Sequence, residues 1–527
     1  MAVHGIDLGT TYSCIAYVDD VGRPTVLRNM EGADTTPSVV FFESPDNVVV
    51  GATAKDSAVL HPDLVVSRIK RDMGQDAPRV RHGRPYTPEE ISAFILRKLA
   101  DDATTTTSET VDDVVITVPA YFGAAERDAT RKAGEIAGLN VIDVVSEPIA
   151  AAITYGVLNP DQDRTILVYD LGGGTFDTTV IKIEGGNIEV VCTDGDHELG
   201  GADWDDRLAE HLAERFRQEH PDAGDPLLDK HSEQQLRRDA EELKKTLSTR
   251  TQHAVRVMHD GRVTTVELTR ESLEELTRDL LDRTIEITRR TMETAAGKGV
   301  RSYDHLVLVG GSTKMPSVSE ALQKEFQLTP RLQDPDLAVA KGAALYAFEE
   351  TYRRLRKAGE PDKAQEIAER AGLSAEQQEQ IAGRTIKTVA SRAFGIMVTD
   401  KETRRRSVEH LVHANDPLPA GVTQDFYTID AGQTGVTVEV MEQAGTAESD
   451  DPEDNGLIAE GLLKIPPGKP AGWPIEVTFA LDASGLLQVT ARERETGEEL
   501  ELRIQIGGMS EEEVAESRAA LSRVQVS

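Results

Sequence analysis

The sequence has few cysteines, few aromatic residues and no long apolar run. It contains two cysteines, Cys14 and Cys192, and aromatic residues make up only 4% of its 527 residues. Two cysteines cannot form a disulfide framework, and neither has the spacing of a metal or redox motif. No apolar stretch reaches the roughly 18 residues of a membrane span, and the first ten residues lack the pattern of a signal peptide. These absences predict a soluble protein of the cytoplasm.

Basic residues are also scarce relative to acidic ones. The chain has 58 Lys and Arg against 92 Asp and Glu, a net charge of −34. Nucleic-acid binding requires basic surface that neutralises phosphates, and anionic membranes make the same demand. The composition therefore argues against both kinds of partner. The 39% hydrophobic content still supplies more than one core.

Residues 1–350 alternate short β-branched runs with longer helical patterns, which is typical of an α/β architecture. Strands are predicted at 114–120, 164–170 and 305–311, and each runs into Pro, Asp or Gly. Residues 351–388 are polar, with sparse apolar positions at helical spacing, and we predict short helices in a solvated connector.

Residues 389–507 have a periodicity of two, which predicts an all-β sandwich. Its clearest strands are expected at 435–443, 473–482, 485–493 and 500–506. Within it, the acidic, turn-rich segment 445–456 is predicted to be a disordered loop. Residues 508–527 then begin with Ser510 and Glu513 in a capping box, which predicts one short C-terminal helix.

Two Gly-containing turns far apart in the sequence have the same pattern. In GIDLGTT (residues 5–11) and VYDLGGGTFD (residues 168–177), an apolar strand leads to an Asp, then to a Gly turn and a Thr. Such a turn exposes main-chain N–H groups that bind phosphate oxygens. The Asp at each strand end, Asp7 and Asp170, can hold Mg²⁺ through water. One such turn is weak evidence, whereas two predict a site that grips a triphosphate from both sides.

A third Gly-rich turn and one helix extend this pattern. The turn LVLVGGSTKMP spans residues 306–316, and the helical stretch at 236–248 precedes it. By themselves, Glu241, Lys244 and Lys245 on that helix are read as a solvated face with paired charges. Together with the two hairpins, they favour a nucleoside site.

Six motifs resemble the heat-shock 70 kDa (DnaK-type) chaperone family. GIDLGTTYS, TVPAYF, AGLNVIDVVSEPIAAAITYG, DLGGGTFD, LGGADWD and VGGSTKMP occur in the family's order. The resemblance covers nearly the whole chain. It implies an actin-like (duplicated RNase H-like) ATPase domain at 1–350, followed by the connector, the β-sandwich substrate domain and the C-terminal helix.

The resemblance also implies roles for individual residues. Asp7 and Asp170 would organise Mg²⁺ through water, and Lys70 would contact the γ-phosphate and the attacking water, although composition alone favours a surface lysine there. The implied catalytic set is Lys70, Glu147, Asp170 and Thr175. The implied ATP/ADP-binding set is Asp7, Gly9, Thr10, Thr11, Tyr12, Gly172, Gly173, Gly174, Asp177, Gly200, Gly201, Glu241, Lys244, Ser248, Gly311, Ser312 and Lys314. The family usually has Arg at position 314, so Lys314 loses the stacking of a planar guanidinium on the base.

In the sandwich, the resemblance places five apolar side chains around a pocket for an extended client peptide. They are Ile396, Phe426, Val436, Val438 and Ile475. Periodicity alone assigns each of them to the sandwich core, so both interpretations stay open for any single residue.

The sequence departs from the family at several positions. The connector 351–388 is longer and more polar than the family's apolar linker, which puts the usual coupling in question. Gly123 and Ala124 replace polar residues at the domain contact, and Asp143 replaces an Arg that meets the J-domain partner, so a standard J-domain loses an attraction there. The chain also leaves room for only a truncated lid, which predicts rapid peptide exchange.

The sequence thus favours an ATP-hydrolysing, Mg²⁺-dependent chaperone that binds apolar segments of client polypeptides, with a nucleotide exchange factor as a further partner. The alternative is a nucleotide-regulated scaffold or adaptor whose sandwich holds one dedicated protein. A sugar kinase on the same fold is disfavoured, because the sandwich matches no small-molecule acceptor site.

Overall fold

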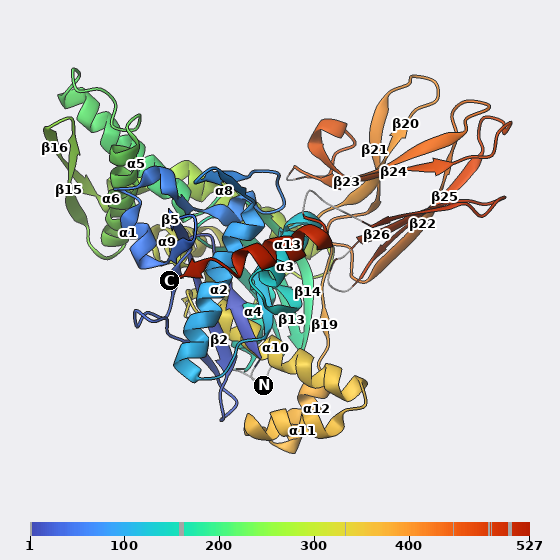
Figure 1. Ribbon diagram of the computed structural model, residues 1–527, viewed down its shortest axis with the longest axis horizontal. Helices are drawn as coiled ribbons and strands as arrows, with labels where there is room; N and C mark the ends of the chain where they lie inside the picture. Colours follow the sequence, from blue (N-terminus) through green and yellow to red (C-terminus); the bar gives the residue numbers. More distant parts are fainter. Residues whose placement is uncertain are drawn as a thin grey trace.

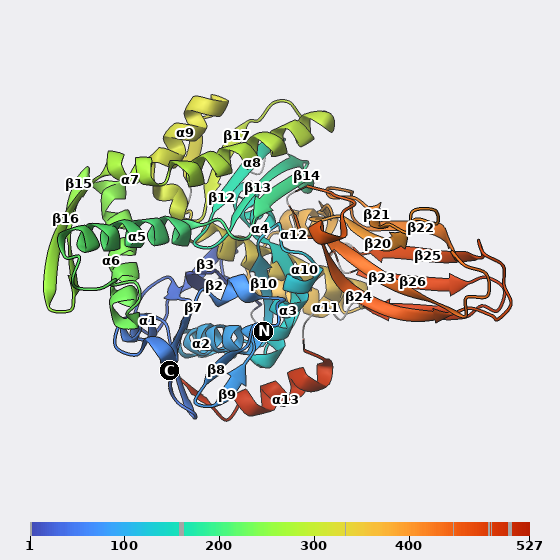
Figure 2. The ribbon, with the colours of Figure 1, turned by 90° about the horizontal axis from the view of Figure 1, so that it is seen from above.

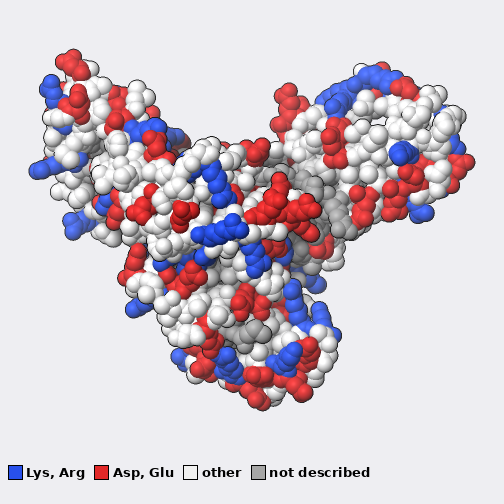
Figure 3. Space-filling view, viewed as in Figure 1, with Lys and Arg blue, Asp and Glu red and all other residues white. Residues whose placement is uncertain are grey.

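The chain folds into a mixed α/β part and an all-β part (Figure 1). The computed structural model describes residues 3–157, 163–332, 334–445, 447–482, 485, 487–503 and 509–527. In these ranges, no helix is long and apolar enough to span a bilayer. Figure 3 shows acidic and basic side chains interspersed over one face.

The first sheet belongs to lobe I, which we define as residues 3–146. Its strand order is β11-β10-β1-β2-β3, with β4 paired to β2. β1 is antiparallel to β2 and parallel to β10. The bounds are β1 (His4–Asp7), β2 (Tyr12–Val18), β3 (Pro24–Leu27), β4 (Thr36–Pro37), β10 (Asp113–Val118) and β11 (Asn140–Ser146).

Lobe II, residues 163–332, repeats this topology. Its sheet order is β18-β17-β12-β13-β14-β19, in which β12 is antiparallel to β13 and parallel to β17. The α/β part is therefore a duplication of one folding pattern. The strands are β12 (Arg164–Leu171), β13 (Phe176–Glu184), β14 (Asn187–Asp196), β17 (His305–Val309), β18 (Pro330–Leu332) and β19 (Ile386–Lys387).

Two helices join the lobes. α4 (Glu147–Val157) and α10 (Ala338–Lys357) contact each other and strands of the sheets. Their Ala-rich faces share an apolar core with β10, β12 and β13. Small side chains allow this close packing of helix on sheet.

Further elements extend each lobe beyond its sheet. Lobe I carries a second sheet of β5, β6 and β7, which we call the small sheet, and the helices α1, η1, α2 and α3. Lobe II carries five α-helices and the hairpin of β15 and β16. Lobe I adds β5 (Val39–Ser44), β6 (Asn47–Val50), α1 (Ala52–Ser57), η1 (Pro62–Leu64), β7 (Val65–Ser67), η2 (Ile69–Asp72), β8 (Arg79–Arg81), β9 (Arg84–Tyr86), α2 (Pro88–Thr107) and α3 (Ala124–Ile136). Lobe II adds α5 (Gly201–Glu219), α6 (Lys230–Thr249), β15 (Gln252–His259), β16 (Arg262–Thr269), α7 (Arg270–Leu276), α8 (Arg278–Gly297), η3 (Gly311–Lys314) and α9 (Pro316–Phe326).

The connector contains two short helices, α11 (Pro361–Arg370) and α12 (Ala375–Gly383). They form a small apolar cluster with Phe348 and Tyr352 of α10. After them, β19 pairs in parallel with β14, with Ile386 opposite Ile188. The connector therefore contains, besides the predicted helices, a short strand that joins the lobe II sheet.

The all-β part is a sandwich of two antiparallel sheets, ordered β21-β20-β23-β24 and β22-β25-β26-β27. Apolar residues of both sheets form one core. The strands are β20 (Phe394–Thr399), β21 (Arg406–Val412), β22 (Ala420–Tyr427), β23 (Gly435–Gln443), β24 (Asn455–Lys464), β25 (Pro474–Leu481), β26 (Leu487–Glu493) and β27 (Glu499–Arg503). Residues 504–506 of the expected last strand lie outside the described residues.

The acidic segment is not the disordered loop that the sequence predicted. Apart from Thr446, which lies outside the described residues, it forms an ordered turn with the 3-10 helix η4 (Pro452–Asp454). Asn455 donates to the carbonyl of Asp451 over 2.8 Å, and Glu448 accepts from the main chain of Ala414 over 2.9 Å. Local side-chain bonds thus offset the low apolar content.

The C-terminal segment does not lie over the sandwich, where the sequence predicted a truncated lid. α13 (Glu511–Leu521) packs on α3, and β28 (Gln525–Val526) pairs with β6. In Figures 1 and 2, α13 runs along lobe I beside α2 and α3 and away from the sandwich strands. The helix buries its apolar residues in the core of lobe I.

Candidate functional site

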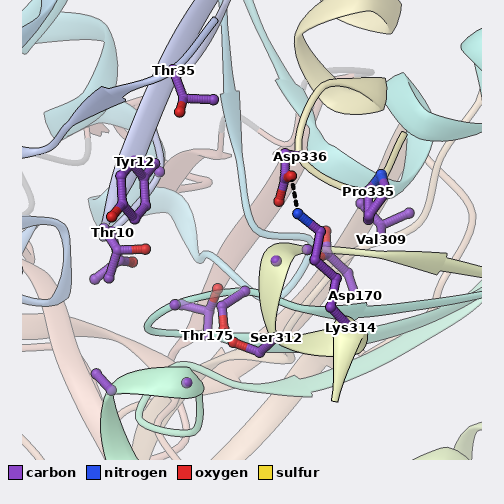
Figure 4. A pocket seen from close by; sticks show the side chains of 18 of the residues that line it. Thr10, Tyr12, Thr35, Asp170, Thr175, Val309, Ser312, Lys314, Pro335 and Asp336 are labelled. Carbon is purple, nitrogen blue, oxygen red and sulfur yellow. Dashed lines mark hydrogen bonds and ion pairs between the residues drawn. The ribbon is translucent and has the colours of Figure 1, made fainter. Parts of the chain in front are cut away.

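A cavity of about 410 Å³ lies between the two lobes. The first hairpin and Lys70 line it from lobe I, and the second hairpin, α5, α6 and η3 line it from lobe II. Figure 4 shows Thr10 and Tyr12 across the cavity from Ser312 and Lys314. Of the sequence-predicted ATPase residues, all but Gly174, Asp177 and Gly200 line this cavity.

The two Gly hairpins meet face to face. A Cβ atom on Gly173 would lie 2.2 Å from Oγ1 of Thr11, and one on Gly174 would lie 2.4 Å from Cγ2 of Thr10. Only glycine permits this approach, which leaves the main-chain N–H groups of both turns at the cavity. A Cβ on Gly200 would also strike the backbone of Gly174.

The partly buried Asp7 and the buried Asp170 line the cavity, and the buried Asp177 lies next to Asp170. Asp7 ends β1, whereas Asp170 and Asp177 face each other as Cα partners on β12 and β13. Burial, reinforced by the nearby Glu147 carboxylate, raises the pKa of Asp7 and of Asp177 to about 7. The same causes raise the pKa of Asp170 well above its usual value. A cation placed beside these groups would lower their pKa values, because positive charge stabilises the ionised carboxylates.

Lys70 is not the surface lysine that composition alone favours. It lies in η2 with 4% of its surface exposed, and its Nζ is 2.7 Å from Oε1 of Glu147 at the start of α4. The ammonium also lies 5.7 Å from the ring centroid of Phe122. The Lys70 ammonium is therefore a buried positive charge beside the buried Glu147 carboxylate.

The adenosine side of the predicted site is built around Glu241 of α6. Burial alone would raise its pKa, but the ammonium groups of Lys55 and Lys245 lower the pKa of Glu241 to about 2. Lys55 lies 2.5 Å and Lys245 2.6 Å from the carboxylate, and the Tyr12 hydroxyl donates to it over 3.2 Å. Sequence reasoning missed the part played by Lys55, since its short helix matches no motif.

The remaining predicted residues surround the same side of the cavity. Lys244 donates to the carbonyl of Gly201 over 2.6 Å and pairs with Asp205. Ser312 donates to the carbonyl of Gly172 over 2.9 Å. Ser248 donates to the main chain of its own helix, and Gly311 also lines the cavity.

Lys314 forms an ion pair with Asp336, marked by a dashed line in Figure 4. No sequence motif predicts a role for Asp336. This pair holds the ammonium at the rim of the cavity, where the lysine side chain is 48% exposed.

Further ion pairs cross the cleft between lobe I and α5. Arg68 binds Asp206 at 2.8 Å and Arg71 binds Asp203 at 2.6 Å. Arg71 also donates to the carbonyl of Gly174 over 3.0 Å. The sequence predicted a role for none of these four side chains, because the partner of each is more than 100 residues away in sequence.

The chemistry of the floor fits a magnesium ion held through water. The described residues contain no group of three or more His, Cys, Asp or Glu arranged to hold a metal directly. Asp177 Oδ2 is buried without a hydrogen-bond partner, which leaves a polar atom to be satisfied. Hydrated Mg²⁺ bound to phosphates requires only one or two carboxylates, so the residues present fit it.

The predicted peptide residues of the sandwich fall into two groups. Ile396, Val438 and Ile475 are at most 5% exposed and belong to the shared core. Phe426 and Val436 are only partly buried and pack against that core. The alternative assignment to the core therefore describes the first three, and the last two reach the surface.

Asp143 does not present an isolated negative charge. Its carboxylate accepts from the Tyr346 hydroxyl over 2.7 Å, and Arg131 lies 4.0 Å away. These partners reduce the charge reversal inferred from the sequence.

Together, the duplicated lobes and this cavity define a two-lobed α/β protein with a glycine-lined cleft, joined to a β-sandwich. The chain belongs to the Hsp70 family, whose sequence pattern, described as Hsp70 protein, matches residues 3–82, 77–348 and 373–523. The predicted family membership is thus confirmed. The matched ranges omit 349–372, which contains α11, and 524–527, which contains β28. Members of this family are ATPases with chaperone function.

Proposed function

We propose that the chain is an ATP-dependent molecular chaperone that hydrolyses ATP with Mg²⁺ and binds apolar segments of client polypeptides. The observation that carries the proposal is that the pair of facing Gly hairpins lines one cavity with the Lys70–Glu147 pair, Asp7 and Asp170. Family membership supports it. The repeated strand order supports an actin-like, duplicated RNase H-like ATPase domain within residues 1–350.

In this proposal, the hairpin N–H groups, Thr10, Thr11 and Thr175 bind phosphates, and Asp7 and Asp170 hold Mg²⁺ through water. Bound Mg²⁺ would neutralise charge on the phosphates. The Lys70 ammonium stabilises the negative charge that develops on the transferred phosphoryl group. Because Glu147 is already paired with Lys70, it positions water but is a weak general base, and hydrolysis is slow without a stimulating partner.

Glu241, Lys244 and Ser248 would contact the ribose and base from α6, opposite Gly311 and Ser312. The engagement of Lys314 with Asp336 keeps this ammonium from lying over the base. We therefore expect ATP to bind without a cation stacked on adenine.

For the sandwich, we propose that Phe426 and Val436 contact the client and that Ile396, Val438 and Ile475 support them from the core. The sandwich is also docked on lobe I, where Ala124 and Ala125 join its apolar core. This docking is the observation that favours the second candidate function, a nucleotide-regulated scaffold that holds one dedicated partner.

One experiment separates the two functions. A fluorescent apolar peptide is titrated into the full chain with ADP and with ATP, both with Mg²⁺. A chaperone coupled to its nucleotide binds the peptide with affinities that differ by at least about tenfold, or 1.4 kcal/mol. Equal affinities favour the scaffold, and the absence of any ATP binding refutes the proposed nucleotide function. Addition of a J-domain protein or a nucleotide exchange factor then tests each partner.

A further inference from the structure

The last residues of the chain form a segment bound to lobe I, residues 509–527, which we call the C-terminal strap. Its helix begins with a capping box between Ser510 and Glu513. Val514, Leu521 and Val524 are buried in the same apolar core as Phe94 of α2. The strap is therefore an integral part of the packing of lobe I.

Polar contacts fix the strap to the helices of lobe I. Arg97 of α2 donates through Nη1 to the carbonyl of Leu521 over 2.8 Å and to that of Val524 over 3.1 Å. Arg518 donates to the carbonyl of Gly138, beyond the end of α3, over 3.4 Å. One arginine thus satisfies two carbonyl groups where α13 ends, which sets the direction of the following strand.

That strand, β28, adds a fourth strand to the small sheet. The main chain of Gln525 donates to Asp46 over 2.9 Å, Ser527 donates to Val48 over 3.0 Å, and Val50 donates to Ser527 over 2.9 Å. Val50 is the last residue of β6, and α1 begins two residues later. The strap therefore holds the base of α1.

The small sheet and its helices close the cleft against α6. Lys55 of α1 binds Glu241, and Asp56 lies 3.3 Å from Arg238. Farther along, Asp63 pairs with Lys230, and the carbonyl of Val59 lies 2.8 Å from His231 Nδ1. Each of these contacts breaks if the small sheet swings away from lobe II.

We propose that the C-terminal strap braces the small sheet against α2 and so slows the opening of the cleft and the release of nucleotide. This inference rests on the proposed nucleotide binding. The small sheet also packs on α2 directly, so the strap tunes its freedom without determining its fold. Arg503, the last described residue of the sandwich, is six positions before Met509, and such a segment spans at most about 20 Å. If the sandwich moves farther from the strap than this length, it must therefore pull on the strap.

The test uses the full chain and a variant that ends at Arg523 and so lacks β28 and Val524. We expect release of a fluorescent ADP analogue to accelerate about tenfold, in line with the loss of one or two net hydrogen bonds. The single-turnover hydrolysis rate should stay within about twofold, because the strap does not touch the cavity residues. Glu516→Ala, on the exposed side of α13, is the matched control.

A second variant tests the opposite effect on nucleotide release and gives an independent result if the truncated variant misfolds. Asn47 and Gln525 are opposed residues of the β6–β28 pair, so the double variant Asn47→Cys and Gln525→Cys places two thiols in reach of each other. The native cysteines are buried. We expect oxidation to slow nucleotide release and reduction to restore it.

The outcomes separate the two proposals. Unchanged release in both variants overturns the brace. If the full chain binds no nucleotide, the proposed function fails. Amide hydrogen exchange of β6 and α1 then tests the brace without nucleotide. Faster exchange there after truncation supports it, and unchanged exchange overturns it.

Discussion

The Glu442 carboxylate in the sandwich lies 3.2 Å from the main-chain nitrogen of Ala124 at the start of α3, and this N–H donates to it. Arg392 lies 2.9 Å from Glu126 and 3.6 Å from Glu442. These three charged side chains form a buried interdomain cluster. Gly123 permits it, because a Cβ atom there would stand 2.3 Å from Oε1 of Glu442.

Gly123→Ala should weaken the docking of the sandwich, because the added methyl group displaces the carboxylate and leaves Arg392 partly unpaired. We expect a larger radius of gyration in small-angle scattering. Gly297→Ala is the control, since nothing lies within 4 Å of its Cβ position. An unchanged scattering profile for Gly123→Ala would mean that the cluster does not hold the domains together.

The docking should also depend on pH. Burial, opposed by Arg392 and reinforced by Glu126, raises the pKa of Glu442 from 4.5 to about 7, and Arg127 and the Ala124 N–H also face it. Between these two values the docked state binds more protons than a separated state, so docking weakens as pH rises from about 4.5 to 7. Scattering at pH 5 and pH 8 measures the change. A Glu442→Gln variant with the same pH dependence would assign it to another group.

Lys70→Ala should abolish turnover while ATP binding is largely kept. Loss of one buried cation beside the reacting phosphate reduces the single-turnover rate by about 100-fold or more. The control is Lys363→Ala on α11, whose side chain is 66% exposed. Unchanged single-turnover hydrolysis in Lys70→Ala removes this lysine from the mechanism.

Val436→Phe should reduce client affinity in an intact fold. Val436 is half-buried at the surface of the sandwich, and a larger ring there fills space that a client side chain needs. Peptide binding by fluorescence anisotropy checks this, with circular dichroism as the measure of folding. The exposed Leu228 on lobe II, changed to Phe, is the control. Normal peptide binding in Val436→Phe would place the client site elsewhere.

Much of the cleft could be predicted from the sequence because its chemistry is local. The Asp, Gly and Thr of each hairpin are neighbours in sequence, so one strand and one turn define the geometry around Asp7 and Asp170. The family resemblance added Lys70 and Glu147, whose 2.7 Å contact joins residues far apart in the chain.

Contacts between distant segments without a motif could not be predicted. Lys55 reaches Glu241 across 186 positions, and neither sequence neighbourhood indicates the other. β19 has only two residues, so it has no periodicity to detect. The capping box of Ser510 and Glu513 revealed the helix α13 but not its docking site, because a cap carries no information about the surface on which the helix packs.

The return of the C-terminal strap to lobe I has a consequence for synthesis on the ribosome. Domains of a growing chain generally fold as units, the N-terminal one first. Here the core of lobe I includes Val514, Leu521 and Val524, which are made after the whole sandwich. Lobe I is therefore completed only after the sandwich has been made, and its groove for α13 stays uncovered until residues 509–527 have emerged.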